Sequence, residues 1–252
     1  MTDPFFILGS PRSGTTMLRD LLRSVPGLYC SEETHFFRWG QPYRTPQFRN
    51  FYLQNKVLVH HRELDGIERS EVEALLERAS TRREFCDGYM ELFLQKSGAP
   101  AGARWFDKTP QNVFGLTLLA HDYPSSRFVH IFRNPLNVVA SLKVGKVMSL
   151  PDTVAAANYW RESVVIAEAF RAHSPERMVS VSYEELTKHP VKTVGEIAAF
   201  VGIEAPADSE LDGVRPEANG FESVLDADEI ETVITICAPA VNELGYSFDK
   251  FG

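Results

Sequence analysis

The chain of 252 residues is long enough for one large domain, and its length does not require two. Hydrophobic residues make up 44% of the sequence and charged residues 24%, which is typical of a soluble globular protein. The formal net charge of −8 excludes proteins that bind nucleic acid through their overall charge, although a local basic site could still hold a small anion.

Cellular context can also be predicted from the sequence. No stretch contains the roughly 20 apolar residues of a membrane span, and the N-terminus lacks the regions of a signal peptide. The three cysteines, Cys30, Cys86 and Cys237, are far apart and odd in number, which favours reduced thiols over a disulfide framework. None has metal-ligand spacing with a histidine. We therefore expect a soluble, cytoplasmic protein.

Strands and helices are predicted to alternate along the chain. Continuous apolar runs predict five buried strands, at 5–8, 28–30, 104–106, 127–133 and 178–182. Apolar residues at three-to-four spacing predict helices at 15–26, 70–79, 85–96, 154–171, 191–201 and 228–244. This alternation favours a three-layer αβα fold with a central, mostly parallel sheet. Ligands of such sheets bind at the carboxyl ends of the strands.

Two strands lead into a cap residue followed by proline. Thr109 can cap a helix that Pro110 opens, and Asn134 can cap a helix from Pro135 to Lys143. Between the second and third strands the stretch 36–103 is rich in Arg, His, Tyr and Phe. We interpret this stretch as a helical insert in a single domain that spans 1–252.

The segment between the first strand and the first helix has the glycine spacing of a phosphate-binding loop. Gly9 and Gly14 enclose four residues, and the loop amides with the helix N-terminus would form an anion cradle. A nucleoside triphosphatase carries lysine after the second glycine, whereas this chain has Thr15 there and Arg12 within the loop. A sulfuryl donor, which carries less charge than a terminal phosphoryl group, would not need that lysine or its metal. The alternative is an ordinary strand-to-helix turn.

Three segments together resemble one enzyme family. Pro-Arg-Ser-Gly-Thr-Thr at 11–16 resembles the 5′-phosphosulfate loop of sulfotransferases that use 3′-phosphoadenylyl sulfate (PAPS). Arg133 at a strand end, followed eight residues later by Ser141, resembles that family's 3′-phosphate site. The segment around Tyr183 is similar to another segment of the family, in which the tyrosine neighbours the 3′-phosphate. Cys-Ser-Glu-Glu-Thr at 30–34 matches a Cys-Gly-Glu-Glu-Thr segment of the tyrosylprotein sulfotransferase branch. The chain resembles that branch most.

The resemblance implies transfer of a sulfuryl group from PAPS to a hydroxyl by in-line displacement, with adenosine 3′,5′-bisphosphate (PAP) as product and no metal. It assigns Glu33 as the general base, and Arg12 and Lys108 as the cations that stabilise the leaving phosphate. Glu32 and His35 remain alternative bases. The residues that it implies for donor binding are Arg12, Ser13, Gly14, Thr15, Thr16, Arg133, Ser141 and Tyr183.

The acceptor and the competing functions stay open. The resemblance fails across 36–103, where acceptor recognition would lie. The candidate acceptors are therefore a small alcohol or phenol, a glycan or lipid, and a peptide tyrosine. Basic residues of the insert favour either an anionic acceptor or a solvated helical face. The runner-up function is an ATP- and Mg²⁺-dependent phosphotransferase, and a third is a nucleotide-binding module without catalysis. The sequence does not decide the oligomeric state.

Overall fold

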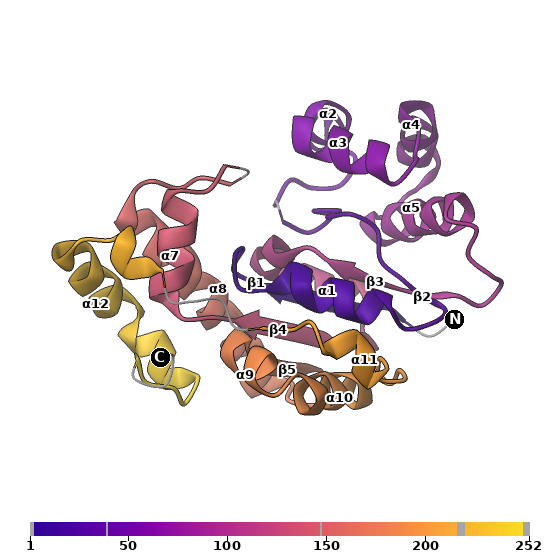
Figure 1. The fold of residues 1–252 in the computed structure, drawn as a ribbon. Coiled ribbons are helices and arrows are strands. Elements are labelled where there is room, and N and C mark those ends of the chain that lie inside the picture. The colour runs from indigo at the N-terminus through magenta and orange to yellow at the C-terminus, as the bar shows by residue number, and fades with distance from the viewer. Residues whose placement is uncertain (1–2, 39, 147, 216–219, 249–252) are drawn as a thin grey trace.

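The computed structural model describes residues 3–38, 40–146, 148–215 and 220–248. Its sheet consists of five strands, β1 (Phe5–Gly9), β2 (Leu28–Tyr29), β3 (Arg104–Lys108), β4 (Phe128–Phe132) and β5 (Met178–Ser182). The strand order is β2-β3-β1-β4-β5, and every neighbouring pair is parallel (Figure 1). The predicted parallel sheet is confirmed, except that Cys30 falls outside β2.

Helices fill the connections between the strands. The first is α1 (Thr15–Arg23), which joins β1 to β2. Between β2 and β3 lie α2 (Pro46–Gln54), α3 (Lys56–Leu64), α4 (Arg69–Arg78) and α5 (Arg82–Lys96). Between β3 and β5 lie η1 (Pro110–Gly115), α6 (Leu116–Asp122), α7 (Pro135–Lys143) and α8 (Thr153–His173). After β5 follow α9 (Tyr183–Lys188), α10 (Pro190–Val201), α11 (Asp208–Leu211), η2 (Phe221–Ser223) and α12 (Ala227–Glu243).

Some of these elements differ from the prediction. Sequence reasoning missed α2, α3 and α9. The capping prediction at Asn134 is confirmed, because its side chain accepts from the Leu136 amide at 2.9 Å. The one at Thr109 is wrong, since this hydroxyl donates to Asp107 instead, and Pro110 opens a 3₁₀ turn before the α-helix.

Side chains of β1 divide the core into two layers, because successive residues of a strand point to opposite faces. Phe5 and Ile7 pack in a cluster with residues of α1, α9 and α10, whereas Phe6 and Leu8 pack with residues of α5, η1 and α6. A strand that is covered on both faces needs apolar residues throughout, which explains the unbroken run that the sequence shows.

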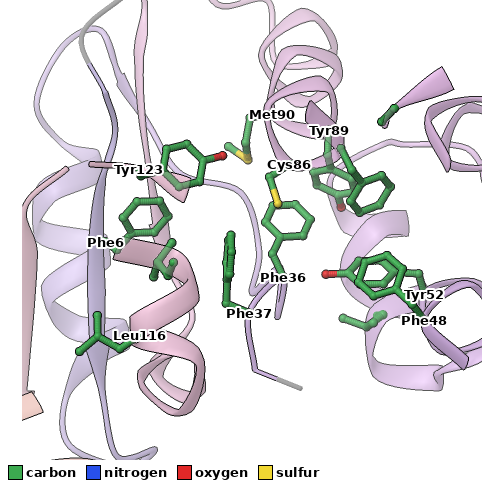
Figure 2. Close-up of a cluster of buried hydrophobic side chains, with 14 of the residues drawn as sticks. Phe6, Phe36, Phe37, Phe48, Tyr52, Cys86, Tyr89, Met90, Leu116 and Tyr123 are labelled. Atoms are coloured by element: carbon green, nitrogen blue, oxygen red, sulfur yellow. The ribbon is translucent and has the colours of Figure 1, made fainter. Parts of the chain in front are cut away.

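The helices between β2 and β3 pack on the second of these faces. Figure 2 shows Phe37 between Phe6 of the sheet and Phe36, with Tyr52 of α2 on the far side of Phe36. The ring centroid of Phe36 lies 6.0 Å from that of Tyr52 and 5.8 Å from that of Phe85 of α5. The chain that enters this core at residue 36 is therefore held by the sheet and by the insert at once.

Within the described part of the chain, no helix combines the length and the apolar character that a membrane crossing requires. Cys30, Cys86 and Cys237 are buried and free. The cytoplasmic location and the single-domain organisation stay predictions.

A buried polar network ties α8 to β4 and β5. The Nδ1 atom of His130 lies 3.1 Å from the hydroxyl of Ser180 and 3.5 Å from a carboxylate oxygen of Glu168. Arg171 donates to the same carboxylate through Nε at 2.8 Å. Burial would raise the pKa of Glu168, but hydrogen bonds from His130, Arg171 and Ser180 lower it to about 2.

A carboxylate whose pKa is lower in the folded than in the unfolded state stabilises the fold above its unfolded pKa, and this stabilisation is lost as the pH falls toward the folded pKa. Glu168→Gln should lower the free energy of unfolding by about 1–3 kcal/mol at neutral pH. The difference from the unsubstituted protein should shrink as the pH falls from 4.5 toward about 2. Urea unfolding of both proteins at a series of pH values measures this difference. A difference that does not change with pH would contradict the lowered pKa of Glu168.

Candidate active site

The loop after β1 contains backbone conformations that residues other than glycine rarely adopt. Arg12 has φ of 70° and Gly14 has φ of 90°. A left-handed conformation at a residue with a side chain costs about 1–3 kcal/mol, and such strain concentrates at functional sites. Ser13 between them is fully buried, and its hydroxyl has no hydrogen-bond partner among the described residues. The N-terminus of α1 begins directly after this turn and favours an anion.

A pocket of about 230 Å³ opens at this loop, and its lining residues are Arg12, Gly14, Thr15, Thr16, Met17, Arg133 and Tyr183. The guanidinium of Arg133 lies 4.4 Å from the ring centroid of Tyr183. A Cβ atom at Gly14 would lie 2.4 Å from the same ring. The pocket therefore brings together the loop and the two strand-end segments that the sequence analysis singled out separately.

Ser141, which the resemblance assigns to the 3′-phosphate together with Arg133, contacts the loop arginine. Its hydroxyl accepts from Nε of Arg12 at 2.8 Å, and its role in donor binding stays a prediction. This bond joins the loop to the last turn of α7, far along the chain. The side chain of Ser141 thus supports the loop arginine.

The ammonium of Lys108 is the charged centre of the site. Lys108 ends β3, and its side chain is only 3% exposed. Its Nζ lies 2.5 Å from Oε1 of Glu33 and 3.3 Å from the hydroxyl of Thr16. A buried ammonium is costly unless it is paired, and here the two partners come from different segments. Lys108 therefore joins the start of α1 to the carboxylate of the predicted base.

A second pocket of about 440 Å³ lies on the other side of the loop. Its lining residues are Pro11, Arg12, Thr15, Thr16, Glu33, His35, Arg38, Asn55, Val57, His61, Pro110, Gln111 and Met148. Arg12, Thr15 and Thr16 line both pockets. Two pockets that share a wall, with Glu33 in the second, suit the transfer of a group between two bound molecules.

The two alternative bases have different surroundings. The carboxylate of Glu32 accepts from the guanidinium of Arg19 at 3.0 Å. Burial would raise the pKa of Glu32, but the charges of Arg19 and Arg23 lower it. Burial, with the nearby charge of Arg38, lowers the pKa of His35 well below its usual range. His35 is therefore neutral near pH 7, and its Nε2 lies 3.6 Å from Oε2 of Glu33.

One polar residue of the site was not predicted. Asp107 is fully buried, and one of its carboxylate oxygens accepts from the hydroxyls of Thr34 at 2.7 Å and Thr109 at 3.1 Å. Burial raises the pKa of Asp107 to about 6, although these two hydrogen bonds oppose the shift. An aspartate within an apolar strand was the available signal. Asp107 links the end of β3 to the residue after Glu33.

Another cavity of about 470 Å³ lies beside β2, at the edge of the sheet, and is lined by Glu32 but by neither Arg12 nor Lys108.

Among the described residues, no group of three or more His, Cys, Asp or Glu side chains is arranged to hold a metal ion. That the reaction needs no metal stays a prediction.

A family model described as the sulfotransferase family matches residues 4–207, and the chain belongs to this family. It is 26% identical over 203 residues to a protein-tyrosine sulfotransferase of Drosophila melanogaster, covering 79% of this chain and 38% of the relative. It is 27% identical over 236 residues to the nodulation protein NoeE of Sinorhizobium fredii, covering 83% of this chain and 52% of the relative. The chain thus spans about half the length, or less, of these relatives.

Solved structures share the fold. The sulfotransferase domain of the Synechococcus PCC 7002 olefin synthase superposes with a TM-score of 0.66 at 20% identity, covering 98% of this chain and 97% of that one. Mouse sulfotransferase SULT7A1 in complex with PAP gives a TM-score of 0.58 at 15% identity, covering 100% of this chain and 88% of that one. These likenesses confirm the predicted P-loop-like α/β fold.

The close packing of Gly14 on Tyr183 can be tested against a second glycine. Gly14 and Gly98 both have positive φ, but a Cβ atom at Gly98 would meet nothing within 4 Å. Gly98→Ala should cost about 1 kcal/mol of stability from backbone strain alone. Gly14→Ala should cost more, because the ring must also move, and should weaken anion binding at the loop. Thermal unfolding of both variants compares them, and equal losses would contradict the packing argument.

Proposed function

We propose that this chain transfers a sulfuryl group from PAPS to a hydroxyl acceptor. The observation that carries the proposal is the Lys108–Glu33 pair. Glu33 lines the second pocket, and Lys108 also contacts Thr16, a loop residue that lines both pockets. Family membership supports it, as do relatives named protein-tyrosine sulfotransferase and a structural neighbour that holds PAP.

The first pocket has the chemistry that an adenosine bisphosphate requires. Arg12 and Arg133 supply two guanidinium groups, which bind phosphate oxygens by charge-assisted hydrogen bonds. The buried hydroxyl of Ser13 lacks a partner among the described residues, and the N-terminus of α1 adds further donors. We assign the loop residues 12–16 to the 5′-phosphosulfate, and Arg133 with Tyr183 to the side of the 3′-phosphate. PAPS would supply an activated sulfuryl group.

Glu33 would act as the general base in the second pocket. It would take the proton of the acceptor hydroxyl while the acceptor oxygen bonds to sulfur and the bond from sulfur to the 5′-phosphate oxygen breaks in line. Arg12 and Lys108 would stabilise the electron pair that the departing phosphate oxygen keeps. The products are a sulfate ester, PAP and a protonated Glu33.

Glu33 is favoured over Glu32 by its contacts. It lines the second pocket and reaches Lys108, whereas Glu32 does not line that pocket and forms ion pairs with Arg19 and Arg23. The wall of this pocket contains apolar residues, including Pro11 and Met148, beside polar ones. A hydroxyl-bearing small molecule, glycan, lipid or peptide remains the acceptor class.

Nucleotide binding is the first test of the proposal. PAP at a hundredfold excess over its dissociation constant should stabilise the fold by about 2.7 kcal/mol, which a thermal shift detects. Arg133→Ala should weaken this effect, whereas Arg69→Ala, on the exposed face of α4, should not. Stabilisation by ATP with Mg²⁺ but not by PAP would favour the phosphotransferase instead.

The base is tested by Glu33→Gln, which removes the proton acceptor but keeps the size of the side chain. We expect unchanged PAP binding and a transfer rate that is lower by a factor of about 10²–10⁴. Radiolabelled PAPS with a panel of phenols, alcohols and tyrosine peptides measures the rate. Glu32→Gln serves as the comparison and should lose far less. The reverse pattern would make Glu32 the base, and full activity of both variants would leave that role to His35.

A further inference from the structure

The segment that carries Glu33 has no regular secondary structure, and side chains hold its backbone instead. Asp65 accepts from the amide of Glu32 at 2.9 Å, and Tyr52 donates to the carbonyl of Thr34 at 3.0 Å. Nδ1 of His61 lies 2.9 Å from the carbonyl oxygen of Glu33 itself. All three side chains come from the helical insert, so the insert contributes to the placement of the base.

His61 occupies the most informative position of the three. A carbonyl oxygen can only accept, so Nδ1 of His61 must carry the proton and donate it to Glu33. The ring also stacks on His35, with centroids 5.9 Å apart and planes 11° from parallel. One imidazole thus contacts both the backbone of Glu33 and the ring of His35.

The same imidazole lines the acceptor-side pocket. Asn55, Val57 and His61 bring the cap and first two turns of α3 into the wall of the second pocket. One helix therefore contacts both the space for the acceptor and the backbone of Glu33. A molecule bound against this wall would touch the element that holds the base.

We propose that His61 is a positioning residue that aligns the carboxylate of Glu33, and that α3 couples acceptor binding to this alignment. The inference rests on the proposed role of Glu33 as the base. A displacement of about 1 Å at a reacting group can cost about 10² in rate, so one hydrogen bond to its backbone is enough to matter. The insert would then determine both which acceptor binds and how well the base is placed.

His61 can be substituted without changing the buried residues that hold α3 in place. Leu58 and Arg62 are the buried residues of this helix, whereas His61 is partly exposed. His61→Phe keeps a ring opposite His35 and removes the donor. His61→Asn restores an N–H donor close to the position of Nδ1. His60→Phe, at the exposed neighbouring residue, is the matched control.

Two phenols serve as acceptor probes with radiolabelled PAPS. Transfer to 4-methylphenol requires removal of a proton, whereas 4-nitrophenol is far more acidic and a substantial fraction of it is already ionised near neutral pH. His61→Phe should lower kcat for 4-methylphenol by about 10-fold to 10²-fold, lower it much less for 4-nitrophenol, and leave PAP affinity unchanged. His61→Asn should recover most of the loss, and His60→Phe should match the unsubstituted protein.

Several results would overturn the inference. Equal losses for the two phenols, a fully active His61→Phe, or an absence of rescue by His61→Asn would each show that His61 does not align the base. Transfer to neither phenol by an unsubstituted protein that binds PAP would also remove its premise. Failure of the unsubstituted protein to bind PAP is a separate result, because it would overturn the proposed function itself.

Discussion

A buried ammonium must be paired, and at Lys108 this requirement organises the whole site. Lys108 stands at the end of β3, in register with Ile7 of β1, so it lies beside the strand that leads into the loop. Its partners, Glu33 and Thr16, belong to different segments of the chain. The pairing therefore sets the distance between the loop proposed to bind the 5′-phosphosulfate and the candidate base, and the proposed group transfer depends on this distance.

The rest of the fold supports this pair from two sides. On the loop side, α7 supplies Ser141, which holds Arg12. On the base side, Asp107 holds Thr34, and the aromatic residues Phe36 and Phe37 anchor the following chain in the core that the sheet and the insert share. The insert thus helps to hold the segment of the candidate base, and it also lines the second pocket.

The sequence predicted the elements whose signals are local. Unbroken apolar runs marked the strands, and the Asn134–Pro135 pair marked the start of α7. The rule that parallel strands present their ends at one edge predicted that the loop, Arg133 and Tyr183 would converge, and they line one pocket. This much of the site followed from motif order and strand direction.

The missed features depend on tertiary contacts. Helices α2 and α3 are short. The buried face of α2 is set by aromatic packing and α3 buries only Leu58 and Arg62, although Thr45 before Pro46 was a usable capping signal for α2. The hydroxyl of Ser141 accepts from Arg12, and that of Thr109 accepts from the amide of Thr34 as well as donating to Asp107. Arg12 and Thr34 could not be read from spacing, because only the fold brings them near. The contact of His61 with Glu33 is of the same kind.

A crystal structure of the protein with PAP would show directly whether Lys108 and the loop contact a phosphate group. The expectation is a 5′-phosphate within hydrogen-bond distance of Lys108 and the loop, and a 3′-phosphate on the guanidinium of Arg133. A nucleotide bound in the cavity beside β2, with Lys108 contacting no phosphate oxygen, would contradict it.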